Sequence, residues 1–165
     1  MATVTLKGDT VHTNGELPKV GSQAPDFKLV DGDLNDRSLV DYKGKKKLLN
    51  IVPSLDTGVC AASTRKFNES LGNRQDVAVL IISADLPFAM QRFCSSENIK
   101  NVISLSMMRS RDFASDYGVL ITDGPLAGIA ARAVVVLDDS DKVVYTQLVP
   151  EIAQEPDYDK ALAAL

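Results

Sequence analysis

The spacing of hydrophobic positions changes several times along the chain, and each change marks a different element. Two runs are continuously apolar, LLNIV at 48–52 and VAVLIIS at 77–83, and both are short enough to be strands buried on two faces. AVVVLD and KVVYTQLV flank Asp139-Ser140-Asp141, which is typical of a hairpin. The pattern therefore predicts strands at 27–30, 48–52, 77–83, 102–105, 133–138 and 142–149.

Helical spacing separates these runs. From Val59 to Leu71 the apolar residues fall at four-residue multiples, charges occupy other positions, and Gly72 follows as a stop. A second helix is expected to open at Pro87, because proline is tolerated in a first turn, and it would carry Cys94. Two shorter helices are expected at 111–117 and 157–165.

The first 25 residues have a character of their own. Residues 3–6 and 10–12 alternate around Lys7-Gly8-Asp9, which predicts a β-hairpin, and the proline- and glycine-containing stretch 15–25 reads as a connector. The rest of the chain shows no repeat and no linker. We therefore expect one domain over residues 1–165, with the hairpin at 3–12 as an addition to it.

The order of these elements predicts the fold class. Strands alternate with helices at first, and an antiparallel hairpin and a helix close the set. This order indicates an α/β fold in which a mixed central sheet has helices on both faces. It is the thioredoxin-like arrangement, here with an extra N-terminal β-hairpin.

Composition and charge exclude several kinds of partner. The 165 residues are 45% hydrophobic and 24% charged, with a net charge of −4. This balance disfavours nucleic acid and anionic membranes as partners, because both need a basic surface. The basic run from Lys45 to Lys47 is interpreted as a solvated loop. The first residues lack the apolar segment of a signal peptide, so we expect a cytoplasmic protein with reduced thiols.

Two cysteines, 34 positions apart, are the candidates for chemistry. They are too few for a disulfide scaffold, and a lone cysteine is most often a small buried hydrophobe. With His12 as the one histidine, and placed on the hairpin, the ligand spacing of a zinc site is missing. No metal and no other cofactor is expected.

Cys60 has the stronger local argument. It follows a strand that ends at Pro53 and lies in the first turn of the helix from Val59. Unpaired N–H groups and the positive end of the helix dipole favour an anion there, so the thiolate is favoured over the thiol. Thr57, three residues earlier, is placed to cap the helix or to offer its hydroxyl to the sulfur.

Four separated motifs carry a resemblance to a known family. PSLDTGVC at 53–60 resembles the peroxiredoxin active-site pattern Pro-x-x-x-Thr-x-x-Cys, and the run NIVPSLDTGVCAASTRKFNES is similar to that of bacterial thiol peroxidases, which are atypical two-cysteine peroxiredoxins. SADLPFAMQRFC, GPLAGIAARAVVVLD and QLVPEIAQEPDYDKALAAL resemble three further segments of that subfamily. The chain has Gly58 where many peroxiredoxins have proline, and Met107-Met108 where the subfamily has a polar residue and phenylalanine.

The resemblance implies a role for each site residue. Cys60 would attack the peroxide O–O bond, Arg132 would stabilise the thiolate and the developing oxyanion, and Pro53 would shield the sulfur. Cys94 would resolve the sulfenic acid on Cys60 as a disulfide, which thioredoxin would then reduce. The resemblance also implies a homodimer and hydrogen peroxide or organic hydroperoxides as substrates.

Two other functions stay open on the residues alone. A thioredoxin-like protein-disulfide oxidoreductase would share the fold, but the Cys-x-x-Cys motif is absent. A non-catalytic binding domain would make both cysteines inert. Reaction of the thiols with peroxide distinguishes all three.

Overall fold

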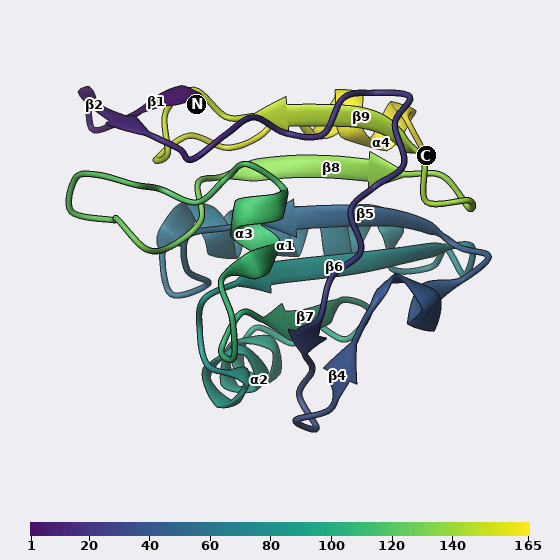
Figure 1. Ribbon diagram of the computed structural model, residues 1–165. Helices are drawn as coiled ribbons and strands as arrows, with labels where there is room; N and C mark the ends of the chain where they lie inside the picture. Colours follow the sequence, from purple (N-terminus) through teal and green to yellow (C-terminus); the bar gives the residue numbers. More distant parts are fainter.

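A seven-stranded mixed sheet forms the centre of the protein in the computed structural model, which describes residues 1–165. The strands lie in the order β4-β3-β7-β6-β5-β8-β9 (Figure 1). Their bounds are β3 (Leu29–Val30), β4 (Asp36–Arg37), β5 (Lys46–Ile51), β6 (Val77–Ser83), β7 (Ile103–Ser106), β8 (Ala133–Leu137) and β9 (Val143–Leu148). Strands β5, β6 and β7 are parallel, and the other pairs are antiparallel. The carboxyl ends of β5 and β6 therefore lie side by side at one edge of the sheet.

Helices cover both faces of this sheet, as the element order predicts. The helices are α1 (Gly58–Leu71), α2 (Pro87–Ser96), α3 (Asp112–Asp116) and α4 (Tyr158–Ala163), and a 3₁₀ turn spans Leu39–Tyr42. Side chains of α1, α2 and α4 share one hydrophobic core, whereas those of α3 belong to the other. Helix α3 lies in front of the sheet in Figure 1. None of the helices is both long enough and apolar enough to cross a membrane.

The two cores explain the continuous apolar runs. Along β5, Leu48 faces the core of α1, and Leu49 and Ile51 face the core of α3. Along β6, Ile81 faces the core of α1 and Ile82 faces the core of α3. None of these side chains in β5 and β6 has exposed surface. Successive side chains of a strand point to opposite faces, so a strand buried on both faces has no polar alternation.

The N-terminal hairpin forms as the sequence predicts. Strand β1 (Thr3–Leu6) pairs with β2 (Asp9–His12), and the turn places Lys7 at φ 53° and Gly8 at φ 90°. Both central residues thus have the left-handed conformation of a two-residue hairpin turn. A small core under the hairpin contains Val4, Val11, Ile121, Ala131 and Ile152. The hairpin therefore packs against the segment that precedes β8 and the segment that follows β9.

The predicted strand at 27–30 is shorter in the structure. Only Leu29 and Val30 are in β3, because the N–H of Phe27 donates to the side chain of Asp26 instead of a neighbouring strand. The same carboxylate accepts the N–H of Leu39 at the 3₁₀ turn. Strand β4 and this turn were not predicted, since each is too short to show a period.

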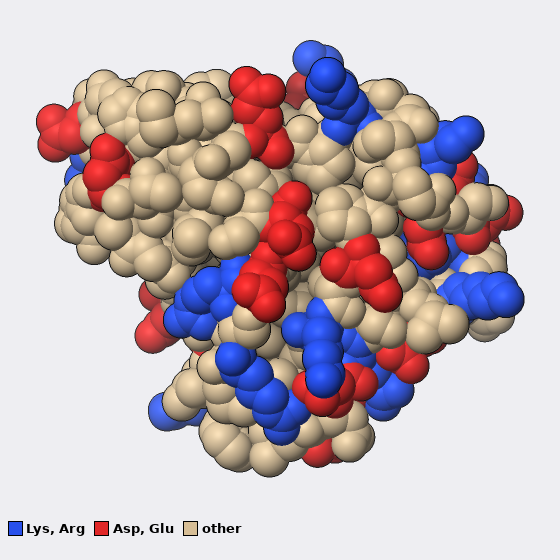
Figure 2. Space-filling view, in the orientation of Figure 1, with Lys and Arg blue, Asp and Glu red and all other residues tan.

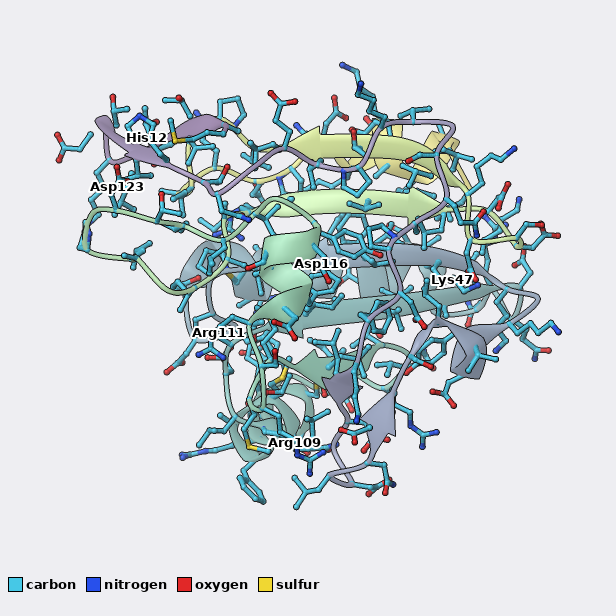
Figure 3. The ribbon with its side chains drawn as sticks, in the orientation of Figure 1. His12, Lys47, Arg109, Arg111, Asp116 and Asp123 are labelled. Carbon is cyan, nitrogen blue, oxygen red and sulfur yellow. The ribbon has the colours of Figure 1, made fainter.

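The expectation that Lys45 to Lys47 form a solvated loop was wrong for Lys46 and Lys47. Lys46 and Lys47 belong to β5, and the side chain of Lys47 has no exposed surface. Its ammonium group bonds to the carboxylate of Asp141 in the β8–β9 turn. A central strand leaves no room for a solvated side chain, so the charge is neutralised by a partner instead. Figure 3 shows Lys47 at the amino end of β5, opposite to the end where α1 begins.

Candidate active site

The site lies where β5 leads into α1. Pro53 is buried just beyond the end of the strand, and the chain then loops back to enter the helix at Gly58. Cys60 is the third helical residue, and its carbonyl accepts the hydroxyls of Ser63 and Thr64 at 3.0 and 2.9 Å. The first N–H groups of a helix have no partner within it, so the sulfur lies at the electropositive end of α1.

The sulfur of Cys60 is paired with a buried cation. Arg132 Nη1 donates to Cys60 Sγ at 3.1 Å, with 0% of Cys60 and 2% of Arg132 exposed. Leu55, Phe67 and Met90 belong to the same core as Cys60. No carboxylate forms an ion pair with Arg132, so its charge is available to the sulfur. A charge pair in such an apolar setting is stronger than the same pair in water.

A backbone carbonyl fixes the orientation of this arginine. Arg132 Nε donates to the carbonyl of Ile152 at 2.7 Å. The neighbouring Glu151 carboxylate accepts the hydroxyl of Thr5 and the N–H groups of Lys7 and Gly8. The hairpin thus fixes the segment at Glu151 and Ile152, and the carbonyl of Ile152 orients Arg132. The sequence contained no signal for this contact, because a main-chain carbonyl can belong to any residue.

Thr57 takes the predicted position but not the predicted contacts. It is the N-cap of α1, with the extended φ and ψ of −124° and 148°. Its hydroxyl donates to the carbonyl of Ser54 at 3.2 Å, and it neither caps the helix nor contacts the sulfur. Thr57 is exposed on the loop just before α1.

Cys94 lies on α2, close to its end. It is half-buried, and both cysteines are free thiols in this structure. Burial raises the pKa of the Cys94 thiol, so at neutral pH this sulfur is protonated. No charged or polar side chain bonds to it. The two cysteines therefore have opposite environments, and Cys60 alone has a cation.

Asp85, which lies between the two cysteine segments, was not predicted from the sequence. Its carboxylate accepts Ser54 Oγ, the N–H of Leu55 and Ser83 Oγ, each at 2.7 Å. A groove of about 590 Å³ beside it is lined by the loop before α1 and by α2. One signal could have identified Asp85: it follows β6 as Pro53 follows β5, and ends of adjacent parallel strands meet.

His12 lies away from this site. Its Nδ1 is 2.6 Å from Asp123 Oδ2, and the pair joins the hairpin to the loop before β8 (Figure 3). His12 lies on the hairpin, as expected from the sequence, and its side chain is partly exposed.

The arrangement can carry out one kind of chemistry well. A thiolate at the electropositive end of a helix, beside a fixed guanidinium and within an apolar wall, is a nucleophile whose charge is stabilised without water. The sulfur attacks one atom of a bound molecule and a second atom departs. The same guanidinium can stabilise the negative charge that develops on this departing atom. Attack on a polarisable bond between two electronegative atoms is the reaction that fits.

Comparisons with known proteins agree with this chemistry. Residues 19–162 match the Redoxin family. The "Thiol peroxidase" of Corynebacterium glutamicum is 52% identical over 165 residues, which cover 100% of this chain and 99% of that protein.

Solved structures give the same result. A peroxiredoxin-like protein from Aquifex aeolicus superposes with a TM-score of 0.92 at 46% identity, covering 100% of this chain and 98% of that one. A thiol peroxidase from Chromobacterium violaceum superposes with a TM-score of 0.91 at 26% identity, covering 98% and 93%. The chain belongs to the Redoxin family and is a peroxiredoxin enzyme of the thiol peroxidase type.

Proposed function

We propose that the protein reduces hydrogen peroxide and organic hydroperoxides with Cys60 as the peroxidatic thiolate and Cys94 as the resolving thiol. The observation that carries the proposal is the 3.1 Å contact between Arg132 Nη1 and Cys60 Sγ in a fully buried setting. It supports Cys60 as the nucleophile because only this sulfur has a fixed positive partner.

In the first step the thiolate attacks one oxygen of the hydroperoxide and the O–O bond breaks. The electron pair goes to the departing oxygen, which takes up a proton and leaves as an alcohol or water, while Cys60 becomes a sulfenic acid. Arg132 stabilises the charge as it moves from sulfur to oxygen. Pro53 and the apolar wall exclude water, and Thr57 at the mouth of the site offers a hydroxyl to the incoming peroxide.

In the second step Cys94 attacks the sulfenic sulfur of Cys60, a disulfide forms and water leaves. The raised pKa of Cys94 keeps its thiol protonated until the site opens, so it does not compete for peroxide. An external dithiol, for which thioredoxin is the expected protein, then reduces the disulfide. A reducing cytoplasm would supply it.

The remaining expectations on partners are proposals of the same kind. We propose a homodimer, which light scattering would test. Figure 2 shows acidic and basic side chains interspersed on the face that carries α3.

The test is peroxide consumption by the reduced protein, coupled to thioredoxin and its reductase. Hydrogen peroxide, cumene hydroperoxide and a fatty-acid hydroperoxide are compared. We expect Cys60→Ser to be inactive, and Cys94→Ser to consume one equivalent of peroxide and stop as a sulfenic acid that reacts with dimedone.

A peroxide reaction that survives in Cys60→Ser would contradict the assignment of the nucleophile. Reduction of insulin disulfides without peroxide consumption would instead favour a disulfide oxidoreductase.

A further inference from the structure

The loop that delivers Cys60 to its position has few attachments to the rest of the protein. Within residues 53–57, the N–H of Asp56 bonds to Ser54 Oγ and the hydroxyl of Thr57 bonds to the carbonyl of Ser54. Every hydrogen bond from this loop to a residue beyond the loop and α1 ends on the carboxylate of Asp85. Apart from these bonds, the loop is anchored by the buried apolar side chains of Pro53 and Leu55.

Asp85 is itself held by the sheet. Its N–H donates to Ser83 Oγ at 3.2 Å, Ser83 Oγ donates to its carboxylate, and its carbonyl accepts Ser106 Oγ. Ser83 ends β6 and Ser106 ends β7, so two buried strands fix the position of the carboxylate. Asp85 also stands two residues before α2, the helix that carries Cys94.

Oxidation changes what holds Cys60 in place. In the reduced protein the sulfur accepts a hydrogen bond from Arg132, and as the thiolate of the proposed mechanism it is also attracted by the positive charge. A sulfenic acid is neutral, so this attraction weakens as soon as the peroxide has reacted. An added oxygen must also fit at a residue with no exposed surface. The bonds to Asp85 are then the main polar attachment that keeps the loop closed.

We propose that Asp85 is a positioning residue that latches the loop before α1, and that its carboxylate sets how fast oxidised Cys60 is released to Cys94. This inference rests on the proposed roles of the two cysteines. The latch keeps Cys60 beside Arg132 for the peroxide step and delays the disulfide step. A longer delay leaves the sulfenic acid exposed to a second peroxide, so the latch also sets sensitivity to overoxidation.

The geometry predicts different results for two substitutions of Asp85. One carboxylate oxygen accepts Ser54 Oγ, and the other accepts the N–H of Leu55 and Ser83 Oγ. Asp85→Asn can turn its amide nitrogen towards Ser54, because a hydroxyl can rotate and accept, while its oxygen keeps the backbone N–H. It therefore loses charge assistance only. Asp85→Ala removes every bond to the loop.

The experiment separates the two steps in time. The chain has no tryptophan, so quench-flow with acid and intact mass would count thiol, sulfenic acid and disulfide after one equivalent of hydrogen peroxide. We expect Asp85→Ala to form the disulfide about tenfold faster than the wild type, the ratio that loss of a charge-assisted hydrogen bond corresponds to. Its peroxide step should slow in proportion to the fraction of open molecules. Overoxidation at high peroxide should fall.

Two further variants test one of these bonds alone and the effect of charge alone. Ser54→Ala removes one of the two bonds to the loop and should accelerate disulfide formation by a smaller factor than Asp85→Ala, which gives a second reading if Asp85→Ala folds poorly. Asp56→Asn removes a charge from the same loop, but its side chain makes no hydrogen bond, and it should match the wild type.

Disulfide formation that is unchanged or slower in both Asp85→Ala and Ser54→Ala would overturn the latch. Acceleration in Asp56→Asn equal to that in Asp85→Ala would also overturn it, because charge alone would explain the result. Failure of the proposed function has a different signature: the wild type itself would form no disulfide after peroxide.

Discussion

Replacing Arg132 by glutamine should affect the rate far more than the fold. The variant removes the positive charge 3.1 Å from Cys60 Sγ. At that separation and an effective dielectric constant of about 20, a full charge pair is worth about 5 kcal/mol. The thiolate before reaction also benefits from this interaction, so only a part of it lowers the barrier. Loss of a preorganised charge-stabilising donor costs about 10² to 10³ in rate, and we expect Arg132→Gln to lose that factor.

The fold should tolerate this change. Arg132 donates to one carbonyl and one sulfur and has no carboxylate partner, and without the cation Cys60 can stay a neutral thiol, so no buried charge is left without a counter-charge. A glutamine amide can still donate to the carbonyl of Ile152. We therefore expect a near-normal melting temperature.

The assay is the second-order rate constant for hydrogen peroxide with the reduced protein, measured by quench-flow. Arg111→Gln is the control, since Arg111 (labelled in Figure 3) likewise donates to backbone carbonyls, those of Met107 and Gly128, but makes no hydrogen bond to the sulfur. A rate within twofold of the wild type in Arg132→Gln would refute the reasoning. An equal loss in the control would refute it too, because a structural effect would then be enough.

Three further predictions follow from other contacts. Hydrogen bonds from Thr5 and from backbone N–H groups lower the pKa of Glu151 from 4.5 to about 2, so its contribution to stability is complete above pH 4.5 and is lost as pH falls towards 2. Glu151→Gln should thus lower Tm at pH 7, and thermal scans should show the difference closing over that pH range. Asp141→Asn leaves buried Lys47 without a counter-charge and should destabilise the fold by about 3 kcal/mol in urea unfolding, more than Lys47→Met does. Hydrogen exchange should show lower protection at 57–64 or 88–96 in the disulfide form than in the reduced form, since both cysteines lie in helices. Equal protection in both forms, with the disulfide confirmed by mass, would contradict a local unwinding.

Much of the fold could be predicted because the buried strands carry a clear pattern. The run at 77–83 matches β6 residue for residue, since a strand covered on both faces consists mainly of apolar side chains. The short strand β4 could not be predicted, because it has no pattern of its own. Asp36 and Arg37 form a strand only because β3 lies beside them. The burial of Lys47 could not be predicted, because its neutralising partner Asp141 lies far away in the sequence.

Some residues of the candidate site could also be predicted from the sequence, and others could not. Cys60 could be found from its place in a first helical turn, and Arg132 only from a resemblance, since an arginine before a strand has no distinctive local pattern. The contacts that orient the site were not predicted. They come from a backbone carbonyl at Ile152 and from Asp85, and both depend on how distant segments meet.

The hydrogen bonds between the hairpin and Glu151 join parts of the chain that are synthesised at very different times. Thr5 is made first, Cys60 next and Arg132 much later, and the carbonyl that orients the arginine belongs to Ile152, which is made later still. A chain that has not yet reached Ile152 thus carries its cysteine without an oriented cation beside it. The proposed peroxide chemistry therefore depends on a contact between a segment that is made early and one that is made late.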